Sequence, residues 1–116
     1  MAKRPYIPRQ GDLVWLEFTP QSGHEQAGRR PALVLSPEAY NRKVGLMLCC
    51  PVTSHAKGYP FEVSVPGGRE ISGVALADQV KSLDWQARRA DFIARAPREA
   101  VVEAAAKIRA LIDVKA

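Results

Sequence analysis

The chain has 116 residues, of which 47% are hydrophobic and 25% charged, so it is long enough for one domain with a single core, and its composition excludes a disordered protein. No apolar run reaches the roughly 20 residues of a membrane-spanning helix, and none follows the basic start as in a secretory signal, so we expect a cytoplasmic protein with no membrane partner. The formal charge of +5 favours polyanionic partners, although it also fits a role in solubility alone.

Stretches rich in β-branched and aromatic residues predict several short strands before the last quarter of the chain. The expected strands are residues 13–18, 32–35, 46–52, 61–65, 73–78 and 79–83. A polar loop is expected at 20–30 and a turn or short helical piece at 36–41. Cys49 and Cys50 fall in the third strand. Because they are adjacent, they cannot form a zinc knuckle and should point to opposite faces, so we interpret them as reduced strand residues.

The pattern changes to helical spacing after Pro97, a residue that suits the first turn of a helix. Glu99 favours the positive end of the helix dipole, and Glu103 and Lys107 are spaced for an i,i+4 ion pair. The apolar stripe consists of Val101, Val102, Ala105, Ile108, Leu111 and Ile112. So broad a stripe must pack on the sheet or on a partner. The sequence therefore predicts a single domain, 1–116, that is mainly β with a C-terminal α-helix and forms a small barrel or curled sheet.

Few residues of the chain suggest chemistry by themselves. There is no phosphate-binding Gly-Lys-Ser/Thr loop, no dinucleotide-binding glycine pattern and no metal-ligand spacing, so we expect no cofactor and no metal. His24 and His55 fall in different loops, and a surface role is the preferred interpretation for each. Arg29 and Arg30 end the long polar loop and place positive charge at the rim of a barrel, where solvated loop charge is the simpler interpretation.

Six blocks of the sequence together form a more specific pattern. They are GDLVW (11–15), EQAGRRPALVLSP (25–37), YN (40–41), PVTS (51–54), KGYPFEV (57–63) and GVALADQVKSLDW (73–85). With these blocks, in this order and spacing, the chain resembles the MazF/PemK family, the RNA-cutting toxins of bacterial toxin–antitoxin pairs. The resemblance implies an SH3-like barrel of the CcdB/MazF/PemK type, a homodimer that binds single-stranded RNA along its groove, and inhibition by an acidic MazE-like antitoxin in that groove.

The resemblance also implies three catalytic residues. The family's arginine before a proline corresponds to Arg30, its threonine after the third strand to Thr53, and its loop glutamate to Glu25. RNA carries its own nucleophile, since the 2′-OH can attack the adjacent phosphorus and leave a 2′,3′-cyclic phosphate and a 5′-OH without a metal. Arg30 suits charge neutralisation and Thr53 can donate a hydrogen bond to the phosphate. Glu25 either accepts the 2′-OH proton or only orients Arg30.

Other residues of the matched blocks are expected to line the RNA groove. Lys57 and Lys81 are placed to bind phosphate, and Gln79 belongs to the same matched block as Lys81. Tyr59 either stacks on a base or is a half-buried strand residue. Family members often carry histidine at the position of Arg29, so this chain adds a cation to the RNA-binding set.

Two other functions fit the same barrel. A non-enzymatic gyrase poison like CcdB acts through aromatic residues at its C-terminus, whereas this chain ends in the non-aromatic residues 113–116. A plain RNA-binding module needs no catalytic group. The pair formed by Arg30 and Thr53 favours the nuclease over both. Trp15 and Trp85 are interpreted as core or dimer-contact residues.

Overall fold

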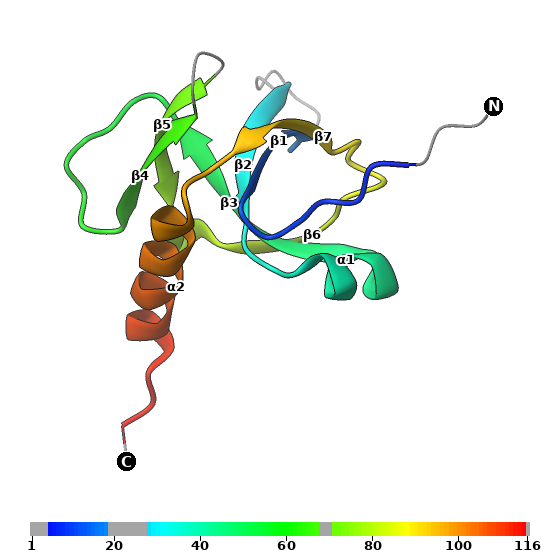
Figure 1. Cartoon of the computed structure of the whole chain (residues 1–116). Helices are drawn as coiled ribbons and strands as arrows, with labels where there is room; N and C mark the ends of the chain where they lie inside the picture. Colours follow the sequence, from blue (N-terminus) through cyan, green and yellow to red (C-terminus); the bar gives the residue numbers. More distant parts are fainter. Residues whose placement is uncertain (1–4, 19–27, 68–70, 116) are drawn as a thin grey trace.

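The computed structural model describes residues 5–18, 28–67 and 71–115, which form a curled sheet with two helices (Figure 1). The elements in chain order are β1 (Asp12–Glu17), β2 (Arg29–Val34), α1 (Glu38–Val44), β3 (Leu46–Thr53), β4 (Glu62–Gly67), β5 (Ile71–Leu76), the 3₁₀ turn η1 (Ala77–Gln79), β6 (Lys81–Asp84), β7 (Asp91–Arg95) and α2 (Arg98–Ile112).

The predicted mainly β architecture with a C-terminal helix is confirmed. Two details of the prediction are wrong: η1 interrupts the strand expected through 73–83, and β7 was not expected. β7 is too short and too exposed for a clear alternation of apolar residues, and it is a strand because it pairs with β1.

The antiparallel sheet is organised around β3, which is paired along both edges. β2 lies along one edge, with Ala32 opposite Pro51 and Val34 opposite Cys49. Along the other edge, the first half of β3 pairs with β6, whereas its last two residues pair with β5. This change of partner lets the sheet curl in the order β4-β5-β3-β2-β1-β7 (Figure 1). As a result, the start of β2 and the end of β3 lie side by side at one rim.

Apolar side chains on the two faces of the sheet form two core clusters. The cluster that contains Cys50 packs against α2, and the cluster that contains Cys49 includes Trp85. The cysteines thus point to opposite faces as predicted, and burial raises the pKa of each thiol to about 12. Trp85 donates its indole N–H to the carbonyl oxygen of Asn41 at 2.9 Å, which confirms its core position. Trp15 is only half-buried.

The face through which α2 packs coincides only in part with the apolar stripe predicted from the sequence, since Val101 and Ile108 pack on the core but the fully buried residues lie outside the stripe. The buried residues of α2 are Ala100 and Ala104, whose small side chains allow the helix to approach the sheet closely. Val102, Leu111 and Ile112 are 54%, 50% and 67% exposed, so the sheet covers only part of the stripe. Across the described residues, we find no helix that combines the length and the apolar character needed to span a membrane.

Gly73 lets β5 approach the end of β3 closely. A Cβ atom at this position would lie 2.2 Å from the carbonyl oxygen of Thr53 and 2.9 Å from its carbonyl carbon. Both atoms belong to the backbone of a paired strand, so they cannot move aside as the end of a flexible side chain can. The absence of a side chain at residue 73 therefore determines where Thr53 lies.

We predict that Gly73→Ala destabilises the protein by about 1–3 kcal/mol, because the added methyl group forces β5 away from Thr53. The midpoint of urea unfolding, followed by circular dichroism, should fall accordingly. Ser64→Ala on the neighbouring strand β4 is the matched control, since Ser64 is exposed and its replacement should change stability by less than about 0.5 kcal/mol. Equal midpoints for the two variants would contradict the close contact.

Candidate active site

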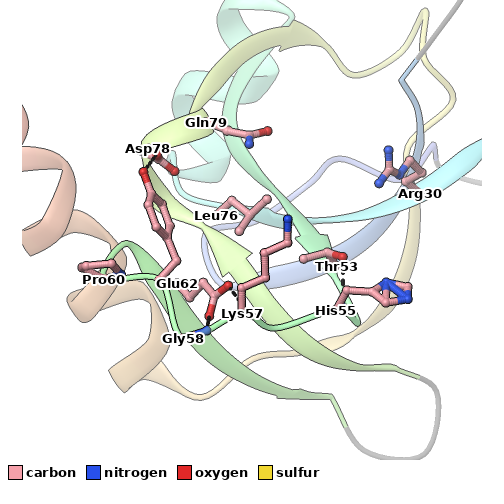
Figure 2. Close-up of a pocket in the computed structure, with 11 residues that line it drawn as sticks. Arg30, Thr53, His55, Lys57, Gly58, Pro60, Glu62, Leu76, Asp78 and Gln79 are labelled. Carbon is pink, nitrogen blue, oxygen red and sulfur yellow. Dashed lines mark hydrogen bonds between the residues drawn. The ribbon is translucent and has the colours of Figure 1, made fainter.

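An open pocket of about 730 Å³ lies at the rim where β2 and β3 meet. Its walls come from the start of β2, the end of β3, the loop that follows β3, and the junction of β5 with η1 (Figure 2). Five of the predicted site residues line it, namely Arg30, Thr53, Lys57, Tyr59 and Gln79. The structure therefore brings together most of the residues that the sequence singled out.

Arg30 and Thr53 are neighbours because of the register between β2 and β3. Ala32 lies opposite Pro51 at the end of this antiparallel pair, and Arg30 and Thr53 each lie two residues beyond it on their own strands. Residues directly opposite each other in an antiparallel pair project from the same face of the sheet. Arg30 is paired with Leu16 of β1 and Thr53 with Val74 of β5, so strand pairing and not a loop sets the position of each backbone.

Arg29 precedes Arg30 in β2 and therefore projects from the opposite face. Its guanidinium donates a hydrogen bond to the carbonyl oxygen of Arg89 at 3.0 Å and forms ion pairs with Glu17 at 3.7 Å and Asp91 at 4.0 Å. Arg30 forms no ion pair within the part of the chain that the structure describes. The charge of Arg29 is thus balanced by carboxylates, whereas that of Arg30 is available to a ligand in the pocket.

The hydroxyl of Thr53 is oriented by the chain that follows it. Its Oγ1 accepts a hydrogen bond from the backbone N–H of His55 at 3.1 Å. An accepted hydrogen bond uses a lone pair of the hydroxyl oxygen and leaves its proton available for a ligand. A smaller hollow of about 390 Å³ adjoins the pocket and shares Arg30, Thr53 and His55 with it. His55, for which the sequence favoured a surface role, therefore belongs to the site.

The loop between β3 and β4 is held by two charged side chains. The carboxylate of Glu62 accepts hydrogen bonds from the backbone N–H groups of Lys57 at 2.8 Å and Gly58 at 3.1 Å. From α2, Lys107 donates through Nζ to the carbonyl oxygens of Pro60 at 2.6 Å and Glu62 at 3.2 Å. Gly58 has a φ of +79°, a conformation that glycine adopts without strain. With the loop held in this way, the side chain of Lys57 extends into the pocket (Figure 2).

Tyr59 and Asp78 are hydrogen-bonded across another part of the pocket wall. The Tyr59 hydroxyl donates to Oδ2 of Asp78 at 2.6 Å, and this hydrogen bond raises the pKa of Tyr59. Tyr59 lies in a loop and is 44% exposed, so its interpretation as a half-buried strand residue is wrong. The second oxygen of Asp78 is buried and has no donor among the described residues.

Sequence reasoning missed Glu62 and Asp78, although both fall in the matched blocks. A carboxylate repels phosphate, so its presence among residues expected to bind RNA could have indicated a structural role.

Three predicted site residues are absent from the lining of the pocket. Arg29 projects from the other face, Lys81 is exposed on β6, and Glu25 lies outside the described residues, as does His24. Within the described ranges, no group of three or more His, Cys, Asp or Glu residues is placed to hold a metal ion.

We predict that Glu62→Gln loosens the loop without unfolding the protein. An amide keeps one acceptor oxygen, but its NH₂ group faces a backbone N–H and cannot bond to it. Hydrogen bonds to charged groups contribute about 1.5–3 kcal/mol, so the amide hydrogens of Lys57 and Gly58 should exchange at least about tenfold faster. Glu38→Gln is the matched control, because it removes only an exposed ion pair with Arg42, far from this loop. Unchanged exchange in Glu62→Gln would show that the carboxylate does not hold the loop.

The chain is similar over nearly its whole length to known toxins. It is 54% identical over 107 residues to the endoribonuclease toxin MazF of Escherichia coli strain K12, covering 92% of this chain and 96% of that protein. It is 38% identical over 119 residues to the endoribonuclease toxin ChpB of the same strain, covering 97% of this chain and all of that protein. A MazE–MazF crystal structure from Deinococcus radiodurans matches with a TM-score of 0.88 and 58% identity, covering 96% of this chain and 100% of the matched one.

The matching family model extends over residues 9–112 and describes a PemK-like, MazF-like toxin of type II toxin–antitoxin systems. The fold predicted from the resemblance is confirmed, since the structural match covers sheet and helix alike. The chain therefore belongs to the MazF/PemK family of type II toxins.

Proposed function

We propose that this protein is a sequence-specific toxin endoribonuclease that cuts single-stranded RNA, an mRNA interferase, at the pocket formed by Arg30 and Thr53. The observation that supports it most is an arginine with no ion pair among the described residues beside a hydroxyl donor at one rim, in a chain 54% identical to an endoribonuclease toxin. A gyrase poison or a non-catalytic RNA-binding module on the same barrel is less well supported, because both relatives compared above are endoribonucleases. A cytoplasmic location is part of the proposal, because the proposed RNA substrate is found there.

The proposed reaction is an internal phosphoryl transfer. The 2′-oxygen forms a bond to the adjacent phosphorus while the bond from phosphorus to O5′ breaks, which gives a 2′,3′-cyclic phosphate and a 5′-OH. The five-coordinate phosphorus between these states carries extra negative charge. Arg30 can bind two phosphate oxygens through its planar guanidinium, and Thr53 can donate its hydroxyl proton to one of them. Both groups are stationary on strands, so little reorganisation accompanies the reaction.

Two protons must also move, one from the 2′-OH and one to O5′. Arg30 cannot serve as a base, because a guanidinium does not lose its proton at ordinary pH. Glu25 remains the proposed acceptor of the 2′-OH proton, with orientation of Arg30 as its alternative role. No metal is needed in this scheme, because the nucleophile belongs to the substrate.

The residues around the rim are suited to hold the flanking nucleotides. Lys57 extends into the pocket and is free of ion pairs within the described ranges, so it can bind a second phosphate (Figure 2). Tyr59 presents an exposed ring next to Phe61, with ring centroids 5.8 Å apart, and can stack on a base. Gln79, which also lines the pocket, offers hydrogen-bonding groups to base edges. Lys81 and Arg29 can only act on a longer RNA that extends beyond the pocket.

We predict that Arg30→Ala lowers the single-turnover rate of RNA cleavage by about 10²–10³-fold, as the loss of one oxyanion donor does. Its unfolding midpoint should hardly change, because Arg30 is exposed. Arg29→Ala is the matched variant: it makes the same chemical change one residue away, and should keep the rate at saturating RNA while flattening the salt dependence of binding. A greater loss of the chemical step in Arg29→Ala would reverse the roles assigned to the two arginines.

The regulation that we propose follows from the same charges. An acidic MazE-like antitoxin segment is a polyanion like RNA, so it can occupy the pocket around Arg30 and Lys57 in its place. The Deinococcus radiodurans toxin to which this chain is 58% identical was solved with MazE. A homodimer with an extended groove is part of the same proposal, and the exposed apolar residues of α2 are available for such contacts.

We predict that RNA in which hydrogen replaces the 2′-OH at the cut position binds but is not cut, because its phosphate contacts remain while its nucleophile is gone. The acidic segment should then displace this RNA in a fluorescence-anisotropy competition. Normal cutting of the substituted RNA would exclude the 2′-OH as nucleophile. A stable ternary complex would exclude competition for one groove and leave the nuclease activity unaffected.

A further inference from the structure

The two hollows at the rim have only three lining residues in common, Arg30, Thr53 and His55. A strand of RNA that places one nucleotide in each hollow has the phosphate between them at these three residues. Arg30 and Thr53 supply the charge and the hydrogen bond that this phosphate needs during cleavage. His55 is the third group at the same place, and the mechanism described so far gives it no role.

His55 is held at the junction by its backbone and keeps its side chain accessible. Its N–H donates to Thr53 Oγ1 at 3.1 Å, which is the only hydrogen bond of His55 to any described residue. The imidazole is exposed, and Figure 2 shows it on the same side of the pocket as Arg30 and Thr53. Both ring nitrogens are therefore available to a ligand.

The cleavage reaction needs a group that gives a proton to O5′ near neutral pH. The cations Arg30 and Lys57 hold their protons too tightly for this task, as guanidinium and ammonium groups do. Tyr59 is also a poor acid, since its hydrogen bond to Asp78 raises the pKa of its phenol.

The carboxylates of the pocket are engaged elsewhere. Glu62 accepts two backbone N–H groups, and Asp78 accepts the hydroxyl of Tyr59. An ionised carboxylate that accepts hydrogen bonds has no proton to donate. An imidazole, by contrast, ordinarily changes its protonation between pH 5 and 8 and can donate a proton as imidazolium.

We infer that His55 is a catalytic residue of the RNA cleavage proposed above, and that it acts as the general acid for the leaving group. As the bond from the 2′-oxygen to phosphorus forms and the bond to O5′ breaks, the His55 imidazolium transfers one proton to O5′. The proton of the 2′-OH leaves to the general base. The products are the cyclic phosphate, a neutral 5′-OH and a neutral imidazole, which regains its proton from water. This assignment rests on the proposed nuclease function.

A leaving-group substitution tests this role directly. Two short single-stranded RNAs are compared, one with the natural bridging O5′ at the cut position and one with sulfur in its place. A thiol has an ordinary pKa of about 8.5 and departs as a thiolate, so the sulfur substrate does not need an acid. We expect His55→Ala to cut the oxygen substrate about 10²–10⁴-fold more slowly than the unsubstituted protein, and to cut the sulfur substrate at nearly the unsubstituted rate.

Arg30→Ala and Lys57→Ala are the matched controls, because each removes a phosphate contact and should slow both substrates equally. Equal slowing of both substrates by His55→Ala, or no slowing, would overturn the assignment. If the unsubstituted protein cuts neither RNA, the nuclease proposal itself fails, so the two failures are distinguishable.

Discussion

The pairing of β3 along both edges is the constraint on which the site depends. β2 occupies one edge, and β6 and β5 share the other, so the end of β3 lies between β2 and β5. Gly73 permits this arrangement, because any side chain there would collide with the backbone of Thr53. A strand with two paired edges has little freedom to shift its register. The chain that leaves β3 then supplies His55, Lys57 and Tyr59 within a few residues.

The charged side chains of the pocket fall into two groups, the cations that can bind a ligand and the carboxylates that hold the protein's own structure. The pocket contains two cations and two carboxylates, yet the described structure pairs none of them with each other. Glu62 is bonded to the backbone of its own loop and Asp78 to a tyrosine hydroxyl. The negative charges therefore stabilise the walls, whereas Arg30 and Lys57 keep their charge for the ligand. On the opposite face of β2, Arg29 shows the other outcome, with Glu17 and Asp91 balancing its charge.

The sequence was most informative where a local rule determines the geometry. Alternation along a strand placed Cys49 and Cys50 on opposite faces, and the resemblance brought Arg30 and Thr53 together before any register was known. The same alternation, applied to Arg29 and Arg30, would have predicted that only one of them faces the pocket. The roles of Glu62 and Lys107 could not be predicted, because they bond to backbone atoms whose positions depend on how α2 packs. β7 and the contact face of α2, which is centred on Ala100 and Ala104, also depend on tertiary packing and not on local pattern.

An open rim is an unfavourable place for electrostatic catalysis, since charges in contact with water interact weakly. Arg30 and His55 are both exposed in the single chain, so their contribution depends on how much water the bound RNA excludes. A nucleotide on each side of the cut, one in each hollow, would cover the phosphate and the three groups around it. On the proposed mechanism, this requirement would favour single strands, because the backbone of a duplex cannot bend into two adjacent hollows with its bases still paired. The proposed inhibition follows in the same way, since an acidic peptide that covers these cations brings no 2′-OH to act as nucleophile.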